Sequence, residues 1–415
     1  MNRLIICSFL CALTTSLFAQ NNYYCTKVAG YIPNYRTSSN VDYSKLTHAF
    51  FAFAIPTPEG GITPFQSWEN NYFKYFKQQC EQHGVKKIIS IGSTNFPAMA
   101  NDAAARKKFA DTITKFCLYH SLDGVDIDWE GLQSSQERTN YQLVMEELHA
   151  SLKAENLLLI STVFYGHYWG QWFPTEGLML ADWLQIMIYD QTGTWNTSPF
   201  GNHSSFQHFK DAETYWVGRG FEKSKLVMGL PFYGYKFNST SGGLATAYTY
   251  NTIVEKFPDM LPSDNQTPGD DLTVFNGPDL IRQKVAYAVE NRFAGVMVWE
   301  MTQDAHGANA SKSLHKVIID QLESSCNQIA SVKERSMEHW SLTRIENQSL
   351  IIDVPYTSRS ILVTISDLTG KVVFQKTYNN ISAVIDIPDT ELTKGLLIVN
   401  VGLDYDVFVG KVLIP

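Results

Sequence analysis

Short apolar runs alternate with longer amphipathic stretches between Lys27 and about Cys326. Such alternation is typical of repeated βα units, in which each apolar run forms one strand of a parallel sheet. Eight runs are candidate strands: 28–32, 46–54, 86–92, 122–130, 157–164, 183–190, 225–234 and 294–300. Eight βα units predict an α/β fold of the (β/α)8 type, a TIM barrel.

The connections between these runs also carry information. Phe109, Ile113 and Phe116 recur at helical spacing in a segment that begins near Ala103, which predicts a helix between the third and fourth strands. The segment 192–205, TGTWNTSPFGNHSS, is polar and rich in turn residues, and predicts a long loop after the sixth strand. Long loops at the carboxyl ends of barrel strands carry active sites, so we expect the functional site there.

The pattern changes after Cys326. Residues 327–340 read as a linker, and residues 341–415 contain short alternating segments separated by turn signals such as Thr369-Gly370. This pattern predicts a small all-β sandwich. The expected organisation is therefore a barrel domain at 20–326, a linker at 327–340 and a sandwich domain at 341–415.

The first nineteen residues have the layout of a secretory signal peptide. Arg3 precedes an apolar run from Leu4 to Leu13, and Ala19 before Gln20 is the expected cleavage point. No later segment reaches the roughly 18 apolar residues that a membrane helix requires. We expect an exported protein, either secreted or at the cell surface.

Composition and cysteines narrow the function classes. A hydrophobic content of 44% allows a sizeable core, and a net charge of −8 argues against a nucleic-acid partner. Loss of the signal peptide leaves Cys25, Cys80, Cys117 and Cys326, an even number in an oxidising compartment. Their wide spacing does not suit a metal site. Cys25 and Cys326 bracket the barrel domain, so a disulfide could tie its ends together and leave the other two as free thiols.

The candidate chemistry lies at the end of the fourth apolar run. Side chains alternate along a strand, so Asp126, Asp128 and Glu130 share one face, while Val125, Ile127 and Trp129 share the other. Asp123 falls outside that register and is expected to be a structural acid. If the apolar set packs against the outer helices, the three carboxyl groups line the barrel interior.

A carboxylate buried without a partner costs several kcal/mol, so stability alone would not favour this arrangement. Crowded carboxylates cannot all ionise, and at least one should hold a proton near neutral pH, as a general acid must. Glu130 is nearest the barrel mouth and is the expected proton donor. The alternative interpretation is an exposed acidic strand end whose carboxylates are simply solvated.

The segment 123–130, DGVDIDWE, resembles the DGxDxDxE signature of family 18 glycoside hydrolases, the chitinases and their relatives. Further segments resemble the family in the same order: VAGYIPNY, MIYDQTGTW, LVMGLPFYG and GVMVWEMTQD. The resemblance covers about residues 25 to 325 and makes 20–326 the expected catalytic domain. In this family the 2-acetamido oxygen of the substrate attacks the anomeric carbon, which forms an oxazolinium ion with overall retention.

The resemblance implies a role for each matching residue. Glu130 would protonate the glycosidic oxygen and later activate water, Asp128 would orient the acetamido group and stabilise positive charge, and Asp126 would tune Asp128. Tyr189 would donate a hydrogen bond to the acetamido oxygen. Asp190 would contact the sugar, and Trp299 would form the floor of the subsite before the cut. Four further aromatic residues are candidates for stacking on sugar, with a core position as the alternative for each: Tyr31, Phe53, Tyr233 and Trp195.

Two departures from the family pattern concern the shape of the cleft. Ser93 stands where the family often has glycine after the third strand. The segment 236–292 is short, which indicates that the α+β insertion of some family members is absent or reduced. A shallower and more open cleft favours cutting within chains.

These observations predict a retaining, endo-acting chitinase that hydrolyses β-1,4 N-acetylglucosamine linkages as a monomer, without cofactor or metal. The nearest alternative is an endo-β-N-acetylglucosaminidase that cleaves the chitobiose core of N-glycans, which the sequence does not separate from a chitinase. A non-catalytic chitin-binding lectin is a third reading, but such proteins generally lack the terminal glutamate that is present here as Glu130. The expected partner is chitin or another glycan that contains N-acetylglucosamine.

The C-terminal segments, with ISDLTGKVV and a closing KVLIP, resemble the sorting domain of type IX secretion in Gram-negative bacteria. This resemblance implies passage across the outer membrane, with the type IX secretion machinery as a partner. The alternative is a carbohydrate-binding or spacer sandwich.

Overall fold

The computed structural model describes residues 25–92, 94–268 and 271–338, and in the C-terminal part 343–346, 349–353, 358–368, 370–381, 384–402 and 407–414. The chain divides into two compact units, residues 1–326 and 327–415. The predicted signal peptide at 1–19 lies outside the described residues, as does Ser93.

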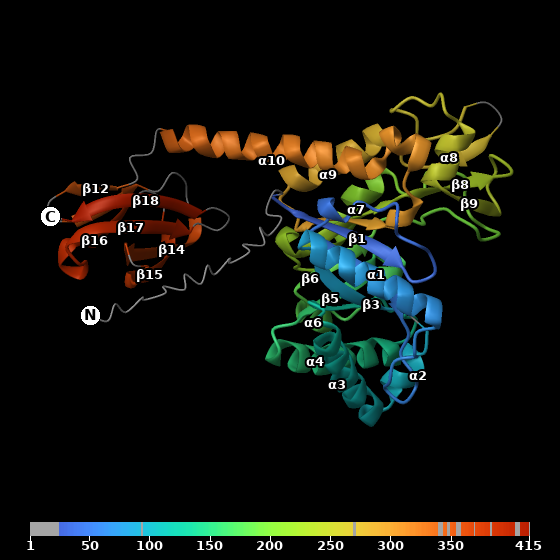
Figure 1. Cartoon of the computed structure of the whole chain (residues 1–415), viewed down its shortest axis with the longest axis horizontal. Coiled ribbons are helices and arrows are strands. Elements are labelled where there is room, and N and C mark those ends of the chain that lie inside the picture. The colour runs from blue at the N-terminus through green and yellow to red at the C-terminus, as the bar shows by residue number, and fades with distance from the viewer. Residues whose placement is uncertain are drawn as a thin grey trace, which may run out of the picture. The chain divides into compact units, whose positions relative to one another are not determined.

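The first unit contains a closed barrel of eight parallel strands, in the order β1-β11-β7-β6-β5-β4-β3-β2. Each strand lies within or beside one of the eight apolar runs, which confirms the predicted TIM barrel. In the view of Figure 1 the labelled barrel strands β1, β3, β5 and β6 lie above α3 and α4. The strands are β1 (Lys27–Pro33), β2 (His48–Ala54), β3 (Lys86–Ile91), β4 (Gly124–Ile127), β5 (Leu158–Phe164), β6 (Trp183–Met187), β7 (Leu226–Pro231) and β11 (Gly295–Trp299).

Two of the predicted strands are shorter than expected. β4 ends at Ile127, so Asp128 and Glu130 follow the strand rather than forming part of it. β7 ends at Pro231, which has no N–H to donate to a ladder. Tyr233 therefore belongs to β8 (Tyr233–Phe237), which pairs with antiparallel strands outside the barrel.

The helix predicted from Ala103 is confirmed as α3 (Ala103–His120). The Asp102 side chain caps it by accepting a hydrogen bond from the N–H of Ala105, and its buried face includes Phe109 and Ile113. The other helices are α1 (Ser67–His83), α2 (Phe96–Asn101), α4 (Ser135–Ala154), α5 (His167–Gly170), α6 (Thr175–Met179), α7 (Phe206–Gly218), α8 (Tyr250–Lys256), α9 (Pro278–Glu290) and α10 (Leu314–Glu338). Short 3-10 helices span Tyr43–Lys45, Lys223–Lys225, Met301–Gln303, Gly307–Lys312 and Asp389–Glu391.

Side-chain alternation along the barrel strands produces two separate apolar clusters. Val125, Ile127 and Trp129 belong to the outer cluster, between strands and helices. Tyr31 and Met297 belong to the inner cluster, inside the barrel. Because β4 sends its apolar side chains outward, its carboxyl groups point into the barrel, as the sequence predicts.

A small α+β insertion lies between β7 and α9. It contains an antiparallel sheet in the order β10-β8-β9, with β9 (Ala245–Thr249) and β10 (Leu272–Val274), and the short helix α8. The insertion is therefore present in reduced form.

The second unit is all-β. One sheet has the order β12-β13-β16 and the other the order β15-β14-β17-β18, and both contribute to a single apolar cluster that includes Leu350, Ile361 and Val399. Two sheets around one core form the predicted sandwich. The strands are β12 (Thr343–Glu346), β13 (Ser349–Asp353), β14 (Ser358–Asp367), β15 (Val372–Ile381), β16 (Val384–Pro388), β17 (Gly395–Gly402) and β18 (Val407–Ile414).

The segment expected as a linker, 327–340, is helical as far as Glu338, because α10 continues through it. The segment contains neither glycine nor proline, so nothing in its sequence ends the helix. Cys25 and Cys326 form a disulfide, which confirms the predicted tie between the ends of the barrel domain. Cys80 and Cys117 are buried free thiols.

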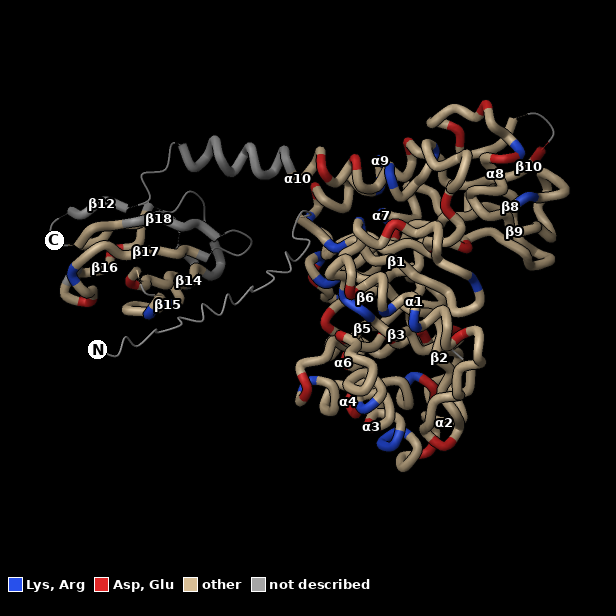
Figure 2. The backbone as a smooth tube through the Cα atoms, viewed as in Figure 1, with Lys and Arg blue, Asp and Glu red and all other residues tan. Residues whose placement is uncertain are grey.

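Charged residues are interspersed along the described chain, where Figure 2 shows acidic and basic positions mixed over the barrel unit rather than gathered in a basic band. Among the described residues, no helix has both the length and the apolar character that would let it cross a membrane.

Candidate active site

A cavity of about 130 Å³ opens at the carboxyl ends of the barrel strands. This is the end at which the sequence places the functional site. Five barrel strands or the residues directly after them supply its lining: Tyr31, Asp128, Glu130, Thr162, Phe164, Met187, Tyr189, Asp190 and Trp299. The cavity therefore brings together five predicted site residues from three separate segments of the sequence: Asp128, Glu130, Tyr189, Asp190 and Trp299.

The glycine that precedes the acidic residues is required by close packing. A Cβ on Gly124 would lie 2.4 Å from the carbonyl oxygen of Leu158 on the neighbouring strand, so no larger residue fits without a shift. Gly131 follows Glu130 with φ +77°, a left-handed conformation that favours glycine. The acidic segment thus lies between one glycine that lets β4 approach β5 and another that adopts a left-handed conformation directly after Glu130.

Asp126 lies deepest and is fully buried. Its Oδ2 accepts hydrogen bonds from the Tyr31 hydroxyl at 2.8 Å and from Ser90 Oγ at 2.7 Å, and its Oδ1 accepts one from Thr162 Oγ1 at 2.8 Å. Burial raises the pKa of Asp126 to about 6, although these hydrogen bonds favour the ionised form. Tyr31, predicted as a sugar-stacking candidate, has its hydroxyl engaged with Asp126 at the floor of the cavity. Gln185 Nε2 donates a hydrogen bond to the Tyr31 hydroxyl at 2.9 Å.

Asp128 stands between Asp126 and Glu130 in the sequence. Its side chain is buried and lines the cavity. Burial raises its pKa well above the ordinary value, and the charges of Glu130 and Asp126 raise it further. The raised pKa agrees with the expectation that neighbouring carboxyl groups cannot all be ionised at once.

Glu130 is exposed at the mouth of the cavity. Even so, the surrounding walls exclude enough water to raise its pKa, and the charge of Asp190 adds to this effect. A glutamate that is reachable from solvent and holds its proton above the ordinary pKa has the properties of a general acid.

Asp190 behaves in the opposite way. Burial by itself would raise its pKa, but the contact with His203 and the hydrogen bonds from Tyr233 and Tyr235 outweigh burial and lower it. The Tyr233 hydroxyl donates to Asp190 Oδ1 at 2.6 Å, so this sugar-stacking candidate is a donor to a carboxylate. Tyr235 and His203 were not selected from the sequence. The one available signal was the spacing of Tyr233 and Tyr235, which share a face of their strand.

The remaining predicted residues divide between the cavity and its surroundings. Tyr189 is buried and lines the cavity, with its hydroxyl 3.9 Å from Met297 Sδ. Trp299 stacks on Phe53 with ring centroids 5.6 Å apart. Trp195 is 41% exposed and lies outside the cavity lining.

Asp123 has the contacts of a structural acid. Lys86 Nζ donates to its Oδ1 at 2.8 Å, and the N–H of Lys87 donates to its Oδ2 at 2.8 Å. Both partners lie on β3, so Asp123 joins the amino-terminal ends of two neighbouring strands, opposite the end that holds the cavity.

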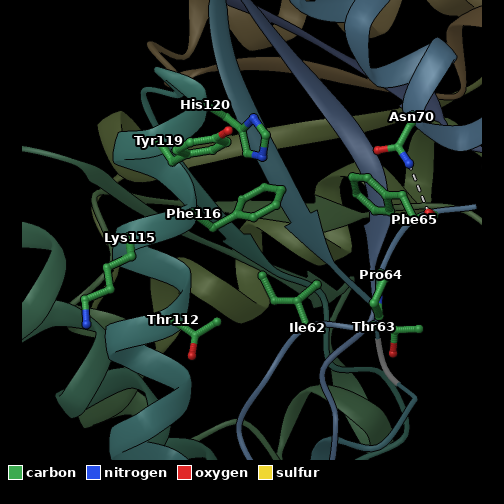
Figure 3. Close-up of a pocket in the computed structure, with 10 residues that line it drawn as sticks. All are labelled: Ile62, Thr63, Pro64, Phe65, Asn70, Thr112, Lys115, Phe116, Tyr119 and His120. Atoms are coloured by element: carbon green, nitrogen blue, oxygen red, sulfur yellow. Dashed lines mark hydrogen bonds between the residues drawn. The ribbon is translucent and has the colours of Figure 1, made fainter.

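A second hollow lies on the outside of the barrel, between α3 and the segment that leads into α1. It has a volume of about 620 Å³, and Figure 3 shows Phe116, Tyr119 and His120 on one side and Phe65 and Pro64 on the other. None of the residues that line it is acidic. This hollow therefore offers no carboxyl group for acid catalysis, whereas the barrel cavity offers several.

Comparison with known proteins points to one family. The model of glycosyl hydrolases family 18 matches residues 27–304. A class V chitinase of Arabidopsis thaliana is 29% identical over 244 residues, which cover 53% of this chain and 64% of that protein. Endochitinase 1 of Metarhizium robertsii is 24% identical over 354 residues, which cover 70% of this chain and 82% of that protein.

Solved structures agree with these relatives. The GH18 chitinase ChiB from the chitin utilization locus of Flavobacterium johnsoniae superposes with a TM-score of 0.62 at 26% identity. The match covers 72% of this chain and 94% of that structure. The matched part corresponds in size to the barrel unit.

Proposed function

The chain belongs to glycosyl hydrolase family 18, and from this membership we propose that it is a chitinase that hydrolyses β-1,4 N-acetylglucosamine linkages. The observation that carries the proposal is the cavity in which Asp128 and Glu130 lie together with Tyr189 and Trp299. The similarity to proteins named chitinases supports the choice of chitin as substrate.

The geometry supports a mechanism in which the substrate supplies the nucleophile. A conventional retaining enzyme places two carboxyl groups on opposite sides of the scissile bond. Here Asp128 and Glu130 come from the same strand end, and both have raised pKa values. Such a pair is suited to donating a proton and supporting a neighbouring group, and the acetamido oxygen of N-acetylglucosamine is the group that can attack.

In the proposed reaction, Glu130 donates its proton to the glycosidic oxygen while the acetamido oxygen attacks the anomeric carbon. The bond between that carbon and the glycosidic oxygen breaks, and the sugar before the cut is left as an oxazolinium ion. Asp128 binds the acetamido N–H and stabilises the positive charge, and Tyr189 donates to the acetamido oxygen. Ionised Glu130 then takes a proton from water, which attacks the anomeric carbon and regenerates the acetamido group.

The mode of attack follows from the insertion. Within the described residues, the regular elements between β7 and α9 are a sheet of three short strands and the seven-residue helix α8. We infer that a wall built from so few elements is low. An open cleft of this kind admits the middle of a polymer chain. We therefore propose endo-acting cleavage, by an enzyme that acts as a monomer.

Partly deacetylated chitosan tests the mechanism and the substrate together. Cleavage is expected only after N-acetylglucosamine residues, because glucosamine has no acetamido oxygen to attack. Sequencing of the new reducing ends and proton NMR of the first product should show an acetylated end and the β-anomer. Efficient cutting after glucosamine, or an initial α-anomer, would rule out substrate assistance.

A high-mannose glycoprotein incubated in parallel separates chitinase from endo-β-N-acetylglucosaminidase. Chitin oligosaccharides should be shortened while the glycoprotein keeps its glycans. Release of intact glycan with chitin oligosaccharides left whole would replace the chitinase assignment, and binding of both without hydrolysis would indicate a lectin.

We also propose that residues 1–19 direct export and that the sandwich is a type IX sorting domain. The support is the sequence resemblance, together with the observation that the sandwich has its own apolar core. Truncation after Trp340 in a host with type IX secretion is expected to leave chitinase activity in cell extracts and to abolish its delivery to the surface or medium. Activity measured in the separated fractions checks this, and unchanged delivery would assign the sandwich another role.

A further inference from the structure

The carboxylate of Asp190 is held by side chains to which the proposed mechanism gives no role. Tyr233 and Tyr235 each donate a hydrogen bond from the phenolic hydroxyl to Oδ1 of Asp190, at 2.6 and 2.7 Å. Nδ1 of His203 lies 3.5 Å from the same oxygen, and it also accepts a hydrogen bond from the backbone N–H of Asp190 at 3.4 Å. Within the described part of the chain, the contacts of the Asp190 carboxylate with these three side chains all involve Oδ1. Asp190 also lines the cavity, with half of its side chain accessible. One oxygen is thus anchored while the residue remains open to the cleft.

His203 is fixed on every side. Its ring is fully buried between the rings of Tyr233 and Tyr235, with centroids 4.9 and 5.0 Å away, and its Nε2 lies 3.2 Å from the carbonyl oxygen of Tyr233. The next residue, Ser204, accepts hydrogen bonds from the buried Nζ of Lys284 at 2.6 Å to its carbonyl oxygen and at 2.8 Å to Oγ. The imidazole therefore cannot turn away from Asp190 without breaking the loop that carries it.

We propose that His203 and Tyr235 are positioning residues of this active site, which hold Asp190 as an anion beside Glu130. The inference rests on the proposed function, because the charge of Asp190 matters for catalysis only if Glu130 is the general acid. The contacts of His203, Tyr233 and Tyr235 lower the pKa of Asp190, and the charge of Asp190 in turn raises the pKa of Glu130. Removing a hydrogen-bond donor to Asp190 should raise the pKa of Asp190, so that Asp190 carries less negative charge at a given pH. The pKa of Glu130 should then fall, and Glu130 should lose its proton at a lower pH.

Other titratable or charged groups surround the pair or the loop that positions it. They are Asp126 and Asp128 in the β4 segment, Tyr31 on β1, Tyr189 after β6, Tyr233 on β8, Lys284 on α9, and Arg36 with Glu300 beside Trp299. Substitutions of Tyr235, Asp190 or His203 leave all of these groups in place. A change in the pH profile of such a variant therefore reports on the charge of Asp190.

The test compares Tyr235→Phe, Asp190→Asn and the double variant with the wild-type enzyme on a fluorogenic chitobioside. Tyr235→Phe is expected to move the alkaline limb of kcat to lower pH by about half a pH unit and to leave KM within about twofold. Asp190→Asn should move the limb further, and adding Tyr235→Phe to it should have no additional effect, because the two residues act through one charge. His203→Gln is expected to shift the limb in the same direction as Tyr235→Phe.

Tyr250→Phe is the matched control, since it removes a buried hydroxyl from the same insertion outside the cavity. An alkaline limb that stays in place in Tyr235→Phe would overturn the proposal, even if the variant melted at a lower temperature. An equal shift on the Asp190→Asn background would do the same. Carboxyl 13C NMR of Glu130 gives this comparison without turnover, so an inactive wild type would count against the proposed function alone.

Discussion

Replacing Glu130 with glutamine is expected to lower kcat on chitin oligosaccharides by about two to four orders of magnitude, the usual contribution of a general acid. Glutamine keeps the size of the side chain and its place at the mouth of the cavity, but it has no proton to give to the glycosidic oxygen and no carboxylate to activate water. Both steps of the proposed reaction depend on the same group. The loss should therefore exceed that caused by any change among the aromatic residues of the cavity.

Binding should survive this substitution. Isothermal titration with chitotetraose is expected to give a Kd within a few fold of the value for the wild-type enzyme under conditions where turnover is slow, because the substitution removes a chemical step and not a surface. Glu146→Gln on the exposed side of α4 is the control, and it should retain full activity. Near-normal turnover in Glu130→Gln would remove Glu130 from the role of acid.

The side-chain alternation in residues 123–130 was enough to predict which carboxyl groups face the barrel interior, because a two-residue period is a local property of the chain. The structure confirms this assignment, with Val125 and Ile127 in the outer cluster and Asp126 and Asp128 at the cavity. The expected disulfide between Cys25 and Cys326 followed from their positions at the two ends of one domain.

The surroundings of Asp190 could not be predicted in the same way. The residues that contact its carboxylate come from β8 and from the loop before α7, and the antiparallel pairing that turns Tyr233 and Tyr235 toward it is a tertiary contact. Residue type alone suggested that Tyr31 and Tyr233 stack on sugar, whereas the partners of their hydroxyl groups are carboxylates. The linker prediction for residues 327–340 is wrong for another reason: the segment is polar but contains no helix breaker, and α10 continues through it as far as Glu338.

The buried carboxyl groups also lower the stability of the folded protein at a pH where they would ionise in water. A carboxyl group whose pKa is raised in the folded protein favours folding fully only below its ordinary pKa, and this advantage is lost as the pH rises through the raised value. Asp128 is such a group, because burial and two neighbouring carboxyl groups disfavour its charge. The wild-type enzyme should therefore lose stability from this site between mildly acidic and neutral pH.

Asp128→Asn is expected to lower kcat by about two to three orders of magnitude and at the same time to raise Tm at neutral pH by on the order of a few degrees. Asparagine has nearly the shape of aspartate but cannot carry the negative charge that stabilises the oxazolinium ion. For the same reason it never incurs the penalty of burying that charge beside Asp126 and Glu130. The gain in Tm should shrink as the pH falls below the ordinary pKa of aspartate, where the wild-type carboxyl group is protonated in both the folded and the unfolded chain. Thermal melts across the acidic to neutral range, with kcat measured on the same samples, check both parts. A lower Tm than wild type at neutral pH would show that Asp128 is stabilised in its charged form in the folded enzyme, and a gain that persists unchanged in acid would show that the gain does not come from removing this charge.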